Sequence, residues 1–166
     1  MIETLCLVIL GYLAAAFQSS AGVFFQVGFI RLDAVPALIC WYSLRQKVPQ
    51  GVVAMVVFGL LISIFSTIPY YLFPISYVLG FLTVRYIISN VLELSKWQIY
   101  LLVGFLSMEI IVAQLAGSGS AELVWPWGLI QSALNVVTAP VFFFIFNRVE
   151  ALLKRLRRDK GDITGG

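Results

Sequence analysis

The sequence predicts an all-α integral membrane protein, a bundle of six transmembrane helices. Of its 166 residues, 61% are hydrophobic and only 11% are charged, whereas a soluble domain has about 25% charged residues. A soluble fold of this length would lack the polar residues needed to cover its surface. The apolar residues also fall into runs near the ~20 residues that cross a bilayer, and six such runs take about 120 residues. No room is left for a separate soluble domain.

The first predicted span covers about residues 5–25, and the second covers about 27–44. The second is short, so an alternative with five spans, in which residues 34–44 do not cross, stays open. The third span covers about 51–68 and stops at a turn between Pro69 and Pro74, because a proline at each end resists helix continuation.

The remaining three spans each contain polar or charged residues. The fourth, at about 75–91, contains Arg85, and the fifth, at about 97–116, contains Glu109. The sixth, at about 124–146, contains Gln131 and Asn135. Residues 1–146 are therefore the predicted transmembrane bundle, and residues 147–166 are a basic tail.

The placement of basic residues predicts the orientation, since cytoplasmic loops are rich in Lys and Arg. With six spans and a cytoplasmic N-terminus, the outer loops hold only Arg31. The inner loops and the tail hold Arg45, Lys47, Lys96, Arg148, Lys154, Arg155, Arg157, Arg158 and Lys160. We therefore expect a multi-pass membrane protein with both termini in the cytoplasm.

Aromatic residues fall near the predicted membrane boundaries. Trp41, Tyr42, Trp97 and Tyr100 lie near the inner boundary. Such residues are typical anchors at the membrane–water interface, and we expect them to act as anchors rather than as a ligand-stacking site.

Polar residues inside spans are costly in lipid, so each needs a partner or a function. Gln18, Glu109 and Gln131 lie at a similar depth in the outer half of the predicted bundle, Asn135 shares a helix face with Gln131, and Arg85 lies nearer the inner side. These five residues form a candidate polar cluster. Two interpretations stay open: an internal hydrogen-bond network, or the lining of a pocket or partner groove.

Small residues recur in the first span at Gly11, Ala15 and Ser19. This spacing lets two helices approach closely in lipid. The stripe is either a packing face within the bundle or a docking face for a partner's transmembrane helix.

The tail repeats apolar residues at helical spacing between basic ones, which predicts an amphipathic continuation of the last span. Such helices lie against anionic lipid, although a cytoplasmic partner is the alternative. The basic residues concerned are Arg148, Lys154, Arg155, Arg157 and Arg158.

The usual residues of an active site or a metal site are scarce. Histidine is absent, which removes the commonest general base and metal ligand. Cys6 and Cys40 are the two cysteines, and their separation does not match a metal or redox motif. We find no phosphate loop or nucleophile motif, and the tail is too short to indicate nucleic-acid binding. We expect no enzymatic activity, no catalytic residue and no cofactor.

Three segments carry a resemblance to a known family. They are Val35-Pro-Ala-Leu-Ile-Cys-Trp-Tyr-Ser-Leu-Arg45, Tyr77-Val-Leu-Gly-Phe-Leu-Thr-Val-Arg85 and Asn135-Val-Val-Thr-Ala-Pro-Val-Phe-Phe-Phe-Ile-Phe, the last followed by the basic tail. Together with the span pattern over residues 1–158, they resemble the bacterial rod shape-determining MreD family.

The resemblance implies a non-enzymatic inner-membrane subunit of the cell-elongation machinery. Its implied partners are a bitopic MreC-like protein and, through it, MreB filaments, a RodA-like glycosyltransferase and a penicillin-binding transpeptidase of peptidoglycan synthesis. The family's bundle is also similar to the substrate-binding subunits of energy-coupling-factor transporters. That similarity supplies the rival hypothesis, a vitamin-binding subunit whose pocket would contain Glu109, Gln131 and Asn135.

Overall fold

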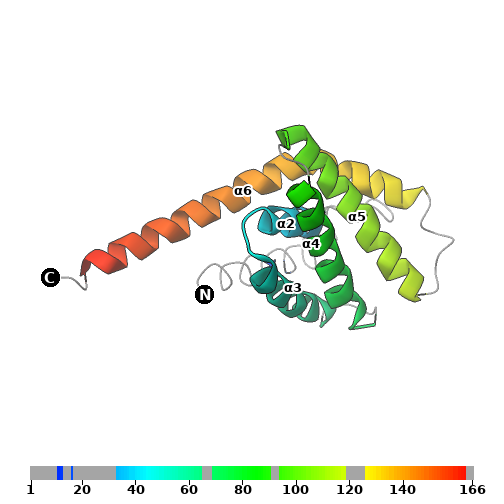
Figure 1. The fold of residues 1–166 in the computed structure, drawn as a ribbon, viewed down its shortest axis with the longest axis horizontal. Helices are drawn as coiled ribbons and strands as arrows, with labels where there is room; N and C mark the ends of the chain where they lie inside the picture. The colour runs from blue at the N-terminus through cyan, green and yellow to red at the C-terminus, as the bar shows by residue number, and fades with distance from the viewer. Residues whose placement is uncertain are drawn as a thin grey trace.

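The computed structural model describes residues 11–12, 16, 33–64, 69–90, 94–118 and 126–163. Within these ranges the chain is helical and contains no strand, which confirms the all-α class (Figure 1). The principal helices are α2 (Val35–Ser43), α3 (Val48–Ser63), α4 (Leu72–Asn90), α5 (Lys96–Ser118) and α6 (Trp127–Ile163).

Three of these helices are long and apolar enough to cross a membrane. They are α4 over Leu72–Asn90, α5 over Lys96–Ala113 and α6 over Trp127–Leu152, and they coincide with the fourth, fifth and sixth predicted spans. Helix α3 is apolar but has 16 residues, which rise about 24 Å against a hydrocarbon core of about 30 Å. The structure therefore supports a membrane protein, while the number of six spans stays a prediction.

The second predicted span contains a short helix that is buried on every side. Helix α2 has nine residues, all of them buried, and they rise only about 14 Å. It lies among α3, α4, α5 and α6, near the middle of the bundle (Figure 1). Residues 27–32 lie outside the described ranges, so a full crossing at 27–44 is not shown. A segment this short is tolerated in a membrane where protein surrounds it.

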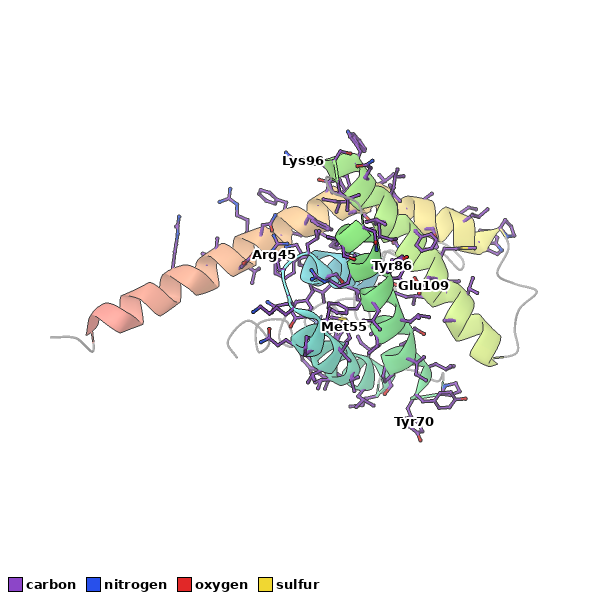
Figure 2. The ribbon with its side chains drawn as sticks, viewed as in Figure 1. Arg45, Met55, Tyr70, Tyr86, Lys96 and Glu109 are labelled. Atoms are coloured by element: carbon purple, nitrogen blue, oxygen red, sulfur yellow. The ribbon has the colours of Figure 1, made fainter. Side chains whose placement is uncertain are left out.

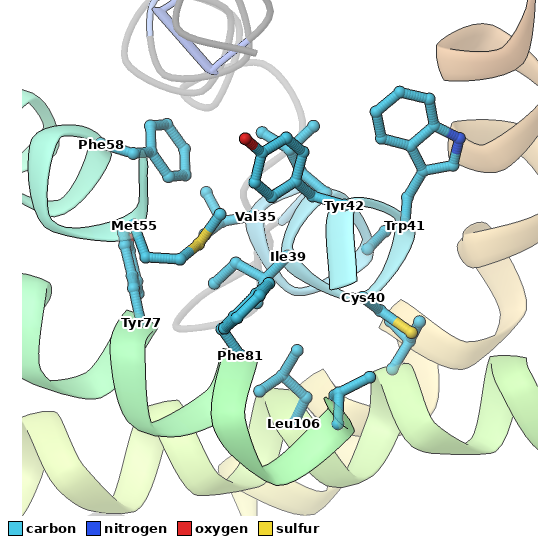
Figure 3. Close-up of a cluster of buried hydrophobic side chains, with 14 of the residues drawn as sticks. Val35, Ile39, Cys40, Trp41, Tyr42, Met55, Phe58, Tyr77, Phe81 and Leu106 are labelled. Atoms are coloured by element: carbon cyan, nitrogen blue, oxygen red, sulfur yellow. The ribbon is translucent and has the colours of Figure 1, made fainter. Parts of the chain in front are cut away.

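The hydrophobic core is built around α2. Figure 3 shows Val35, Ile39 and Tyr42 of α2 pointing toward side chains of the neighbouring helices. Phe58 of α3 stacks on Tyr77 of α4, with ring centroids 5.4 Å apart. The core also takes in Leu38 and Cys40 of α2, Met55 of α3, Phe81 of α4 and Leu106 of α5.

Helices α3 and α4 approach each other closely at a glycine. A Cβ atom added to Gly59 would lie 2.5 Å from the Cα and N atoms of Pro74. Backbone atoms cannot move aside as a side chain can, so only glycine permits this approach. Small residues perform this role between helices in membranes.

The predicted tail continues the last membrane helix, as the sequence pattern indicates, because α6 runs without interruption to Ile163. Its 37 residues rise about 55 Å. The ribbon of α6 changes direction partway along and extends beyond the other helices (Figure 1). Pro140 lies inside this helix, and an internal proline bends a helix by removing a backbone hydrogen bond. The boundary predicted at residue 146 thus falls inside one helix.

Candidate functional site

The structure separates the predicted polar cluster into three places, and Gln18 lies outside the described residues. Asn135 is only 1% exposed, and its Nδ2 donates a hydrogen bond to Ser107 Oγ of α5 at 2.7 Å. Gln131 Nε2 donates to Asn135 Oδ1 at 3.1 Å, one turn away on α6. This first group is a hydrogen-bonded connection between α5 and α6.

Glu109 belongs to a different seam, between α5 and α4. Thr83 Oγ1 of α4 donates a hydrogen bond to Glu109 Oε1 at 3.2 Å. Ser107 and Glu109 are two residues apart and therefore differ by about 200° around the helix axis. Ser107 faces α6 while Glu109 faces α4, so the similar depth expected for Glu109 and Gln131 does not bring Glu109 to the group of Gln131 and Asn135.

The carboxylate of Glu109 is only half satisfied. Its second oxygen, Oε2, is buried and has no hydrogen-bond partner among the residues that the structure describes. Buried acceptors without a donor are rare and need an explanation.

Arg85 hydrogen-bonds to the buried helix α2 and not to the other described residues of the predicted polar cluster. Its Nη1 donates a hydrogen bond to the carbonyl oxygen of Ser43 at 3.2 Å, at the last residue of α2. The last carbonyls of a helix lack partners within it, and a cation there also complements the helix dipole. Arg85 therefore caps α2 from α4.

A second arginine caps the same helix end and ties it to α6. Arg45 Nη1 donates to the carbonyl of Trp41 at 3.1 Å, and Nη2 donates to Asn147 Oδ1 of α6 at 2.7 Å. Arg45 Nε pairs with Glu150 Oε2 at 3.2 Å. The guanidinium carbon also lies 4.3 Å from the centroid of the Trp41 ring. We call these four residues, Trp41, Arg45, Asn147 and Glu150, the Arg45 cluster.

Sequence reasoning missed the Arg45 cluster. Trp41 was expected as a membrane anchor, but it is buried, and its Nε1 donates to Asn147 Oδ1 at 2.9 Å. Tyr42 is buried as well, whereas Trp97 is 74% exposed, as an anchor would be. The available signal was the spacing of Trp41 and Arg45, which places them on one helix face.

The small-residue stripe of the first span is described only at Gly11. A Cβ atom added there would lie 2.4 Å from the Phe58 ring of α3. At Gly11 the stripe therefore packs within the bundle, and this position is not open to a partner helix. Ala15 and Ser19 lie outside the described residues.

The tail keeps its basic residues on a helix. Arg148 is exposed, and its guanidinium carbon lies 5.1 Å from the centroid of the Phe144 ring. Arg155 is exposed, while the side chains of Lys154, Arg157 and Arg158 lie outside the described part of the chain. Binding of anionic lipid or of a partner by the tail stays a prediction.

An apolar groove of about 310 Å³ runs along the outside of the bundle between α4 and α5. We call it the α4–α5 groove. It is lined by Ile87, Leu94, Gln98, Leu101, Leu102 and Phe105.

Across the described residues, no group of three or more Cys, Asp or Glu side chains is placed to hold a metal ion. In comparisons with known proteins, no family model, no curated protein and no solved structure matches the chain. The function is therefore argued from the geometry and from the resemblance described above.

Proposed function

We propose that this protein is a non-enzymatic membrane subunit of the MreD type, which binds and positions partner membrane proteins of cell elongation in the bacterial inner membrane. The observation that carries the proposal is how the buried polar side chains are used. Asn135 and Arg85 both bind other parts of the bundle. They hold helices together rather than converge on a substrate.

The segments that resemble the family support the same proposal. The segment 35–45 supplies the buried helix α2 and, in Arg45, its cap. Gly80 lies at the contact between α4 and α5, where an added Cβ would meet Leu106. Asn135 joins α6 to α5. The resemblance therefore falls on residues that determine how this bundle packs.

The rival function, vitamin binding, has weaker support. Its pocket was expected to combine Glu109 with Gln131 and Asn135. Glu109 instead bonds Thr83 of α4, while Asn135 bonds Ser107 of α5. A ligand pocket needs a few polar groups that converge on one cavity, and these groups face different seams.

Depletion of the protein from its host tests the proposal. We expect rod-shaped cells to become round and to incorporate less labelled peptidoglycan precursor, with recovery on re-expression. Affinity purification in mild detergent should recover an MreC-like bitopic protein together with components of wall synthesis. Unchanged cell shape, or recovery of a transporter ATPase module instead, would overturn the proposal.

A further inference from the structure

The half-satisfied carboxylate of Glu109 lies one helical turn beyond the lining of the α4–α5 groove. Phe105, in the groove lining, precedes Glu109 by four residues on α5, and Ile87 follows Thr83 by four residues on α4. Residues four apart lie on the same face of a helix. The hydrogen-bonded pair of Thr83 and Glu109 therefore lies on the same faces of α4 and α5 as the groove. It is one helical turn farther along both helices. Figure 2 labels Glu109 on α5, which runs beside α4.

The surface around this seam is apolar and large. Leu101 on α5 is 62% exposed, and Leu82 and Tyr86 on α4 are exposed as well. Lipid chains would cover such a surface adequately if it carried no polar group. Acyl chains offer no N–H or O–H group, however, and in the hydrocarbon region an acceptor without a donor costs free energy. The unmet acceptor distinguishes this seam from an ordinary lipid-facing surface.

We propose that the α4–α5 groove is the docking site for a transmembrane helix of another membrane protein, and that this helix carries an N–H or O–H donor at the depth of Glu109. The inference rests on the proposed function, because it specifies where a partner binds. Apolar side chains of the partner fill the groove, and the donor meets the carboxylate. Oε2 is buried in the free bundle, so docking requires the Glu109 side chain to change its torsions and to turn this oxygen toward the partner's donor.

The test uses the full-length protein in its host membrane. A photo-crosslinking residue replaces Leu101 in the groove or, as the matched control, Val137 on α6, which is 73% exposed. We expect adducts from position 101 that map by mass spectrometry to the membrane-spanning segment of an identified protein with a donor at that depth. Position 137 should give mainly lipid adducts.

Variants of Glu109 test the role of the carboxylate. Glu109→Leu removes the acceptor and should lower the protein adduct at position 101 about tenfold, given the strength of hydrogen bonds between membrane helices. Glu109→Gln keeps a carbonyl acceptor and should retain the adduct within about threefold. Replacing the partner's donor by Leu should reproduce the Glu109→Leu result. Each variant must remain monodisperse in mild detergent, and Thr83→Val serves as a second, milder variant.

The outcomes separate this inference from the proposed function. Adducts with lipid alone, adducts with a second copy of this chain, or protein adducts that Glu109→Leu leaves unchanged would each overturn it. None of these results affects the proposed function, which is judged by cell shape and by the identity of the purified partners.

Discussion

Replacing Arg45 by alanine should destabilise the end of the bundle at which α2 stops. The guanidinium joins the last turn of α2 to α6 through Trp41, Asn147 and Glu150. Without it, the carbonyl of Trp41 loses its cap, and Asn147 keeps only the indole N–H as a donor. We expect α2 to be held less firmly against α6.

The magnitude follows from the four contacts of the guanidinium. The charged hydrogen bond to Asn147 contributes about 1–2 kcal/mol, and the bond to the Trp41 carbonyl about 1 kcal/mol. Side-chain exposures of 32% for Arg45 and 26% for Glu150 allow solvent to screen the ion pair, which we discount to about 0.5 kcal/mol. Stacking on Trp41 adds about 0.5 kcal/mol. Because such terms overlap, we expect a loss of about 2–3 kcal/mol.

Reversible unfolding in mixed micelles, by titration with a denaturing detergent, measures this loss. Arg45→Lys keeps the charge but not the planar fork of donors, and it should lose about 1–2 kcal/mol. Arg155→Ala removes an exposed arginine and serves as the control, with a change within about 0.5 kcal/mol. A loss for Arg45→Ala no larger than that of Arg155→Ala would refute the reasoning.

The other predictions concern the interior of the bundle. In a double-mutant cycle, Asn135→Ala and Ser107→Ala should show a coupling between about 0.6 and about 1.7 kcal/mol, the average and the maximum for hydrogen bonds between membrane helices; a coupling of zero would contradict the contact. Gly59→Val should destabilise the protein by about 1–3 kcal/mol, because its Cβ meets the backbone of Pro74, and a stable variant would show that α3 and α4 do not approach there. Cys40 is fully buried, so in a Cys6→Ser background a maleimide should label it only after unfolding, and rapid labelling of the native protein would contradict its place in the core.

Hydropathy alone cannot distinguish the two kinds of apolar helix in this bundle. A helix surrounded by protein and a helix surrounded by lipid are both apolar on all sides. The segment containing Leu38 and Tyr42 therefore looked like a weak span, although its residues are buried against neighbouring helices. The only indication in the sequence was the short length of this segment, which is why the alternative with five spans stayed open.

Depth could be estimated from the sequence, but direction around the helix axis could not. Glu109 and Gln131 were expected near one level, yet Glu109 bonds Thr83 of α4, while Gln131 bonds Asn135, which in turn bonds Ser107 of α5. Partners such as Thr83 and Ser107 are short hydroxyl residues that no motif distinguishes. They become visible only when two helices are placed side by side.

The sequence by itself determined that the chain is helical and belongs in a membrane. It also predicted on which side of the membrane the basic residues lie. These properties depend on composition and on the transfer of side chains between lipid and water, which act on each segment separately. Only the tertiary structure decided that α2 lies inside the bundle, that Arg45 and Arg85 cap it, and that one oxygen of Glu109 finds no donor within the described part of the chain. These facts depend on which faces pack together when helices far apart in the sequence come into contact. In a chain that is apolar throughout, small and polar residues determine which faces those are.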